Sequence, residues 1–488
     1  MLLAAFFILA GVAASKVSAR FGIPALLLFL VLGMLAGSDG PGGIYFDDAG
    51  VAQSLGVIAL SLILFSGGLD TTWEDATAVA PRSAVLATLG VVLTAGTLAL
   101  LTWKVVGLPL HTAVLLGAIV SSTDAAAVLA VLRSKSISLK GTLRPLLEVE
   151  SGGNDPMALF LTTVAIGLAM GNPPGVGETL LRFVWQFALG GAFGYLAGRA
   201  YPWIMTRIDL EYEGLYPVLS LGLVLATLGL TTLAGGNGLL AAYVSGIVAA
   251  RTNFYHRRAM ARFHAGVAWL MQITMFMALG LLVFPSRLPS VAVPGLAIAG
   301  LLVFVARPVS VILCTLPFRL HWREVALLCW VGLRGAAPVV LATFPLLAGV
   351  PDADLLFHLV FFVVLVSTAL QGTTVPYVAK WLGVDAPLVD RPPYPIEYNP
   401  VAGLRGTLEE LEVPLGSPAA GRSIMSLHLP EDLLVVLVAR DDSFSIARGS
   451  TVVRPGDRLL VLAHEASLDE TRRRLGLPGE YQEAMTKA

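Results

Sequence analysis

Five ionisable residues stand inside long apolar stretches of this 488-residue chain, namely Asp124, Glu150, Asp155, Arg307 and Arg334. An ionised group near the centre of a lipid bilayer costs on the order of 3 kcal/mol, so such residues normally face a protein interior or water and serve a function. Three carboxylates face two guanidinium groups. If each arginine neutralises one carboxylate, a proton or a metal cation can neutralise the third. The charge count alone therefore predicts a cation/proton site.

The composition indicates a membrane protein. Hydrophobic residues make up 56% of the chain and charged residues 13%, whereas a soluble globular protein carries roughly a quarter charged residues. Charge is also uneven, at about a tenth of residues 1–380 and about a quarter of the last 108 residues. The net charge of -1 leaves no basic face for nucleic acid. Cys314 and Cys329 both lie in apolar runs, so neither a disulfide framework nor a metal knuckle is expected.

About thirteen apolar runs can each cross about 30 Å of hydrocarbon, which predicts an all-α polytopic membrane protein. They lie at residues 2–15, 21–37, 51–69, 84–106, 111–132, 146–170, 180–205, 215–234, 236–252, 265–284, 294–316, 324–348 and 355–380. Loops after odd-numbered runs, counted with the adjoining ends of the runs, hold fifteen Lys and Arg residues, and loops after even-numbered runs, counted in the same way, hold three. Because positive charge collects on cytoplasmic loops, we expect the N-terminus outside and the C-terminus in the cytoplasm.

The C-terminal part has a different character. Five prolines between Asp385 and Pro400 indicate a stiff linker. Short β-rich runs follow at 404–414, 432–440, 443–449 and 457–464, and a polar helix is expected from Ser467 to Leu475. We therefore predict a transmembrane domain over residues 1–382, a linker over 383–402 and a small α+β cytoplasmic domain over 403–488.

Two of the predicted spans are interrupted. Residues 121–124, Ser-Ser-Thr-Asp, are all good helix N-cap types in the middle of the fifth span, and residues 332–338 place Gly332, Gly335 and Pro338 in the middle of the twelfth. Interrupted helices at corresponding positions of two halves point to a transporter site, since half-helix ends and unwound carbonyls bind ions at the midplane. Asp124 would offset the positive end of the half-helix that follows it.

Each of these residues also has a plain structural interpretation. Asp124 can be the cap of a half-helix and still touch an ion. Asp155 precedes a proline, so the sixth span could begin there and leave Glu150 in a cytoplasmic loop. Arg334, flanked by glycines, could be a loop residue, and Arg307 could extend to the cytoplasmic surface.

Three motifs together resemble the monovalent cation/proton antiporters, most of all the bacterial sodium or potassium/proton exchangers with an Asn-Asp pair. These motifs are ESGGND at 150–155, STD at 122–124 and GLRG at 332–335. The resemblance covers nearly the whole membrane part. It implies thirteen spans with inverted repeats, two broken helices that cross, a homodimer through both membrane and C-terminal domains, elevator movement, and location in the bacterial inner membrane.

The resemblance also implies roles for individual residues. Asp155 corresponds to the carboxylate that binds cation and proton alternately, and Asn154 to the neighbour that replaces a second titrating acid, which implies electroneutral exchange. Asp124, Thr123 and Ser151 would lie around the monovalent cation, with Asp155 and Asp124 as its carboxylate ligands. A structural ion pair is expected between Glu150 and Arg334, with Arg307 as a further charge partner.

The resemblance has one departure and one extension. Ser66 stands where many relatives carry an acidic residue, so sodium selectivity does not follow from the motifs. The tail from Gly421 to Ala463 resembles the C-terminal regulatory subdomain of RCK/TrkA-type potassium-transport proteins. Such domains pair and bind a small, nucleotide-like regulatory ligand, although no glycine-rich nucleotide-binding half precedes this one. Joined to this membrane part, the tail favours K+ over Na+.

Two other classes remain as alternatives. A cation channel gated by an RCK-like domain would need a selectivity-filter sequence such as TVGYG, which is not present. A membrane enzyme would need a His/Glu metal cluster or a serine/base pair in the spans, and none is found. The leading hypothesis is therefore a secondary antiporter that exchanges K+, or Na+, for H+, has no cofactor and is regulated by its tail.

Overall fold

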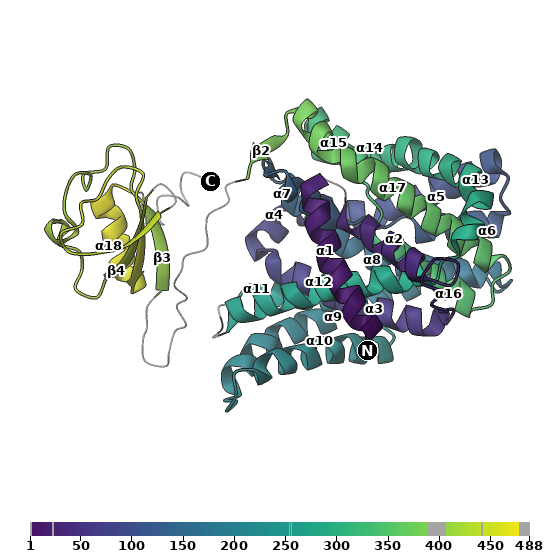
Figure 1. Ribbon diagram of the computed structural model, residues 1–488, viewed down its shortest axis with the longest axis horizontal. Helices are drawn as coiled ribbons and strands as arrows, with labels where there is room; N and C mark the ends of the chain where they lie inside the picture. The colour runs from purple at the N-terminus through teal and green to yellow at the C-terminus, as the bar shows by residue number, and fades with distance from the viewer. Residues whose placement is uncertain are drawn as a thin grey trace. The chain divides into compact units, whose positions relative to one another are not determined.

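The computed structural model describes residues 2–21, 24–252, 254, 256–388, 407–440 and 443–477. The chain divides into two compact units, Met1–Val389 and Asp390–Ala488. Figure 1 shows the first as a mass of helices and the second as a small sheet with one helix. This is the all-α membrane part with an α+β tail that composition predicted. The boundary between the units falls inside the predicted linker.

The helices of the first unit account for most of its residues. They are α1 (Leu2–Phe21), α2 (Ala25–Ala36), α3 (Ala49–Asp70), α4 (Trp73–Val85), α5 (Val91–Leu101), α6 (Leu110–Ile119), α7 (Ala125–Ser134), α8 (Leu143–Ala169), α9 (Val176–Arg207), α10 (Leu215–Leu233), α11 (Gly238–Ala250), α12 (Arg257–Leu281), α13 (Leu288–Leu301), α14 (Arg307–Thr315), α15 (Trp322–Trp330), α16 (Ala336–Leu347) and α17 (Ala353–Leu382).

Seven helical segments among the described residues are long and apolar enough to span a membrane, and further apolar helices of 10–17 residues accompany them. The count of thirteen spans stays a prediction. Two of the long segments, Trp73–Val106 and Pro285–Phe318, have 34 residues each and contain a π-helical turn, at Leu86–Gly90 and Leu302–Ala306. Each is followed by an interrupted helix and then by a continuous one, so the order of elements repeats.

The membrane helices pack as two groups. We call α4–α8 with α13–α17 the site bundle, because both interrupted helices belong to it. The flanking bundle is α1–α3 with α9–α12, in which α11 packs against α9 and α3, and α12 packs against α3 and α2. Figure 1 shows α9, α10 and α11 together, away from α13 and α14. The two bundles meet mainly where α3 contacts α16 and where α11 contacts α8.

Helix α8 settles where the sixth span begins. It runs without a break from Leu143 to Ala169, with Pro156 in its interior. Asp155 is therefore not an N-cap, and the alternative that the span starts there is wrong. Glu150 lies in the same helix and is 1% exposed, so it is a buried charge and not a loop residue.

A short two-stranded sheet joins the start of the predicted linker to the site bundle. Strand β1 (Ile137–Leu139) lies between α7 and α8, and β2 (Asp385–Pro387) follows α17; they pair antiparallel, with Ser138 opposite Ala386. Lys140 extends the contact, because its backbone N–H donates to the Val384 carbonyl and its Nζ to the Gly383 carbonyl, each at 2.9 Å. The linker expected from residue 383 thus begins as ordered structure; its residues from 389 onward lie outside the described part.

The tail forms the sheet and helix that the sequence predicted. Strands β3 (Thr407–Glu412), β4 (Leu434–Arg440), β5 (Ser443–Ile446) and β6 (Arg458–Ala463) make an antiparallel sheet of order β3-β6-β4-β5, and α18 (Glu465–Leu475) closes the chain. Its core contains alternate residues of β6 and two leucines of α18, with buried apolar residues of β3, β4 and the connecting segments.

One buried carboxylate anchors a turn of the tail. Asp457 accepts two hydrogen bonds of 2.7 Å from the Arg440 guanidinium and one of 2.7 Å from the Arg454 backbone N–H. Burial alone would raise the pKa of Asp457, but these hydrogen bonds and positive charges outweigh it and hold the pKa below its ordinary value.

Candidate functional site

The two helix breaks touch each other inside the site bundle. Helix α6 ends at Ile119 and α7 starts at Ala125, while α15 ends at Trp330 and α16 starts at Ala336. The backbone N–H of Asp124 in the first break donates to the Leu333 carbonyl in the second, at 2.8 Å. The two broken helices therefore meet at their breaks, as the resemblance to the antiporters implied.

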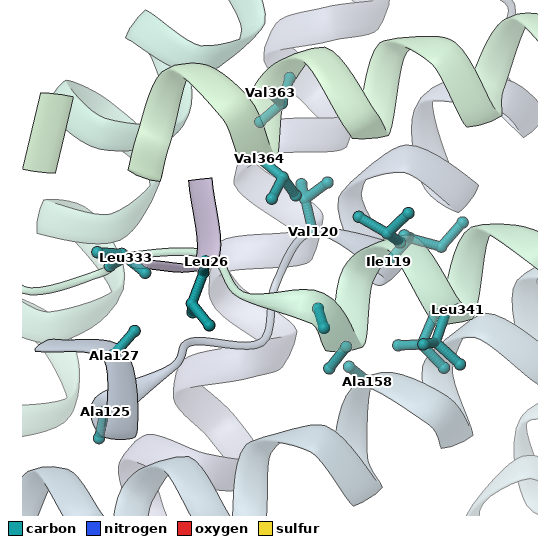
Figure 2. Close-up of a cluster of buried hydrophobic side chains, with 14 of the residues drawn as sticks. Leu26, Ile119, Val120, Ala125, Ala127, Ala158, Leu333, Leu341, Val363 and Val364 are labelled. Carbon is teal, nitrogen blue, oxygen red and sulfur yellow. The ribbon is translucent and has the colours of Figure 1, made fainter. Parts of the chain in front are cut away.

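A glycine permits this close approach. A Cβ at Gly335 would lie 2.1 Å from a carboxylate oxygen of Asp124, closer than any real contact. Apolar side chains cover the crossing elsewhere: Figure 2 shows Ile119 at the end of α6, Val120 of the first break, Leu333 of the second and Val364 of α17. All of these are fully buried.

Arg334 binds the first break through its backbone. The Arg334 Nη1 donates to the carbonyl oxygens of Ser121 and Ser122, at 2.7 and 2.5 Å, and the side chain is fully buried. The carbonyl oxygens of the unwound segment therefore accept hydrogen bonds from this charged guanidinium. Two hydroxyls of α17 hold the backbone of Arg334. Ser367 Oγ accepts a hydrogen bond from its N–H, and Thr368 Oγ1 donates one to its carbonyl. Sequence analysis did not find these two α17 residues, since nothing local marks them.

Glu150 pairs with a different arginine from the one expected. Arg307 Nη1 lies 2.7 Å from Glu150 Oε1, with the two side chains 4% and 1% exposed. No ion pair joins Glu150 to Arg334 among the described residues, so the pairing implied by the resemblance is wrong in this respect. The alternative that Arg307 extends to the surface is also wrong. Arg307 starts α14 directly after the π-helical turn Leu302–Ala306, which aims it inward.

Asp124 has two structural roles. Its Oδ1 accepts from the backbone N–H of Ala127 at 2.9 Å, so it caps α7. A carboxylate at a helix N-terminus is favourable because it meets unsatisfied N–H groups and the positive end of the helix dipole. Asp124 also lines the cavity described below. The cap interpretation is therefore right, and it does not exclude contact with an ion.

Three further predicted residues form one hydrogen-bonded cluster between the first break and α8. Ser151 Oγ donates to the Thr123 carbonyl at 2.9 Å and accepts from the Ala125 N–H at 3.2 Å. Asn154 Nδ2 donates to Thr123 Oγ1 at 2.6 Å. These contacts fix α8 against the break, so the predicted residues Thr123, Ser151 and Asn154 are indeed together.

Asp155 opens onto a cavity of about 540 Å³. The cavity is lined by both Asp155 and Asp124, and by Ser122, Thr123 and Ser151 beside them. It extends to Arg133 and Ser134, at the last turn of α7, which the charge pattern predicts to be the cytoplasmic end. The cavity therefore reaches from the carboxylates to the last turn of α7.

Two residues of the flanking bundle contact α8 next to Asp155. Tyr243 of α11 lies against Gly152, where a Cβ would come within 2.2 Å of its ring. Asn237, the N-cap of α11, donates from Nδ2 to the Pro156 carbonyl at 3.0 Å. Sequence analysis missed both residues. An Asn before a helix signals its cap role, but its second hydrogen bond depends on packing across the bundles.

The charges at the crossing can now be counted by position. Arg307 offsets Glu150, and the charge of Arg334 lies on the carbonyls of the first break. Among the described residues neither Asp124 nor Asp155 forms an ion pair with these arginines, and both line the cavity. That one carboxylate is left for a mobile cation or proton stays a prediction, and the partner of Glu150 is Arg307.

The fold is that of a sodium proton antiporter. The chain resembles the structure of MjNhaP1 from Methanocaldococcus jannaschii at pH 8, with a TM-score of 0.67 and 23% sequence identity, over 78% of this chain and 99% of that one. A second structure of the same antiporter gives a TM-score of 0.65 at 22% identity.

Sequence comparison identifies the family. Residues 2–381 match the model of the transmembrane sodium/hydrogen exchanger, and residues 408–476 match that of the TrkA-C domain. The chain belongs to the sodium/hydrogen exchanger family. Both resemblances drawn from the motifs are thereby confirmed.

Relatives match over nearly the whole length. The chain is 38% identical over 464 residues to the K(+)/H(+) antiporter NhaP of Alkalimonas amylolytica, which covers 95% of this chain and 80% of that protein. It is 37% identical over 461 residues to NhaP2 of Shewanella oneidensis, also named a K(+)/H(+) antiporter, covering 93% of this chain and 79% of that protein. The Na(+)/H(+) antiporter NhaP of Pseudomonas aeruginosa is 31% identical over 356 residues, covering 67% of this chain and 81% of that protein.

Proposed function

We propose that this protein exchanges cytoplasmic K+ for H+ across the inner membrane of a bacterium, with Na+ as a second substrate. The observation that carries the proposal is the pair of carboxylates, Asp155 and Asp124, lining one cavity beside a crossing of broken helices. The relatives named K(+)/H(+) antiporters match far more of the chain than the one named for Na+. Ser66 supports K+ as well. It lines the cavity where many relatives carry an acidic residue, so the wall is less acidic than theirs.

Asp155 is the residue that alternates between cation and proton. It lies in the middle of α8, opens to the cavity and lies near Asp124, so the two negative charges favour an added positive charge. Asn154 beside it cannot titrate and instead holds the first break through Thr123. With one carboxylate left over after pairing, one proton exchanges for one cation, and no net charge moves.

Movement of the site bundle against the flanking bundle would carry the site across the membrane. Between the bundles, Tyr243 and Asn237 of the flanking bundle donate hydrogen bonds to the Glu148 and Pro156 carbonyls of α8. A conformational change of this kind needs contacts that differ between its two states. In this proposal the flanking bundle stays fixed as part of a homodimer, with the N-terminus outside and the C-terminus in the cytoplasm.

Reconstitution tests the activity directly. Full-length protein in proteoliposomes with an imposed proton gradient should dissipate the gradient on addition of K+, and more slowly with Na+. In K+-free vesicles driven by Na+, a change of membrane potential should leave the rate unchanged. A current without proton movement would instead indicate a channel, and a rate that rises with inside-negative potential would show that a second carboxylate, such as Asp124, also releases a proton.

The tail regulates exchange through the β1–β2 sheet. Strand β1 connects α7, which begins at the first break, to α8, which carries Asp155, and β2 lies at the start of the linker to the tail. A force on the linker would therefore be transmitted through the β1–β2 sheet to both α7 and α8. Regulation requires that the tail's small ligand bind one conformation better than the other.

Two truncations separate the tail from its attachment. A chain ending after Leu388 keeps β2, and we expect it to exchange at the full rate while losing dependence on tail ligand. A chain ending after Gly383 also loses β2, and we expect a several-fold lower rate because the connection between α7 and α8 is no longer held. Proton flux in proteoliposomes measures both. If the chain ending after Leu388 is folded but inactive, the tail is an obligate part of the transporter.

A further inference from the structure

Four hydroxyl groups lie where the first break meets α8, and three of them are already hydrogen-bonded. Ser121 Oγ donates to a carbonyl one turn back in its own helix, at 2.6 Å. Ser151 Oγ donates to the Thr123 carbonyl, and Thr123 Oγ1 accepts from Asn154. The fourth, Ser122 Oγ, has no hydrogen-bond partner among the described residues. Buried hydroxyls are almost always paired, so this one needs an explanation.

Ser122 is placed as a ligand would be. It is 1% exposed, and it is one of the residues around the cavity that Asp124 and Asp155 also line. Its hydroxyl is near enough to the Asp155 carboxylate to interact with it but does not reach hydrogen-bonding geometry. Its carbonyl accepts from Arg334 Nη1 at 2.5 Å, which holds the backbone at this position.

We propose that Ser122 Oγ is a direct ligand of the transported cation, beside the carboxylates of Asp155 and Asp124. Alkali cations bind hard oxygen ligands, and a hydroxyl offers two lone pairs without adding charge. The inference rests on the proposed function, since it takes Asp155 as the cation-binding carboxylate. A neutral ligand at this position sets affinity and the choice among cations, and leaves the stoichiometry to the carboxylates.

The test uses full-length protein with Ser122→Ala and Ser122→Cys, the second being close to serine in size but with a soft sulfur that binds K+ poorly. In proteoliposomes at alkaline pH, where protons compete least, we expect the half-saturating K+ concentration to rise on the order of tenfold, with the maximal rate retained. The change should differ among Li+, Na+, K+ and Rb+, because a lost ligand affects ions of different size unequally.

Ser121→Ala is the matched control, since its hydroxyl is bonded within its own helix, and its half-saturating concentration should stay unchanged. A binding measurement without transport is the K+-dependent rise in thermal stability in detergent, which Ser122→Ala should lose. In K+-free buffer Ser122→Ala should be as stable as the unmodified protein, because its hydroxyl has no bond to lose.

Two results would overturn the inference. One is an unchanged half-saturating concentration and thermal shift in both Ser122 variants. The other is a shifted pH profile with unchanged cation affinity at alkaline pH, which would make Ser122 a hydrogen-bond donor to Asp155 and not a ligand. Failure of the proposed function gives a different result, because Asp155→Asn would then still exchange cations for protons.

Discussion

Asp155→Asn is expected to reduce cation-coupled proton flux to the level of empty vesicles, a loss on the order of a hundredfold or more, because it removes the group that binds cation and proton in turn. The variant should still fold. Asparagine has nearly the same shape, and an amide costs less to bury in the middle of α8 than a carboxylate does. The measurement is proton flux in proteoliposomes, with expression and monodispersity in detergent recorded for the same preparations.

Glu148→Gln provides the matched control for this prediction. Glu148 is also a carboxylate of α8 and lines the same cavity, but Arg144 already pairs with it at 3.0 Å. We expect its loss to change the rate only a few-fold. Retained K+-dependent flux in Asp155→Asn, or equal loss in both variants, would mean that the transporting carboxylate is elsewhere.

The second large effect is expected from breaking the buried pair of Glu150 and Arg307. Glu150→Gln leaves Arg307 buried without its acid, and Arg307→Gln leaves the carboxylate uncompensated, so each should cost about 3 to 5 kcal/mol of stability. The double variant should cost less than the two single changes added together, with a coupling of about 1 to 3 kcal/mol. Thermal unfolding of the four proteins in detergent gives these values.

Two further cycles show whether the coupling is specific. Glu178 and Arg182 form an exposed pair, 50% and 57% exposed, and should couple by less than about 1 kcal/mol. Glu150 with Arg334 should couple more weakly than Glu150 with Arg307, because the Arg334 guanidinium donates to carbonyl oxygens. If the Glu150–Arg334 coupling is the larger of the two, the pairing implied by the resemblance is correct in solution.

Much of the fold could be predicted from local signals. The cap types at 121–124 predicted the first break, and Asp124 does cap α7. Glycines at 332 and 335 predicted the second break. Alternating apolar residues and turn residues predicted all four strands of the tail. The sequence could not predict that residues after α17 would form β2, because a three-residue strand exists only through its partner, β1, more than two hundred residues earlier.

The sequence by itself determined which charges lie within apolar stretches and where the helices break, and it predicts that one carboxylate is left for a cation or proton. Those features depend on composition and on neighbours in the chain. Only the tertiary structure decided that Glu150 pairs with Arg307, 157 residues away, and that Ser122 alone among its neighbours keeps an unpaired hydroxyl. The charge count is the same for either arginine, and the hydroxyls are chemically alike. Which groups meet is fixed by helix packing and the resulting distances, which no local pattern encodes.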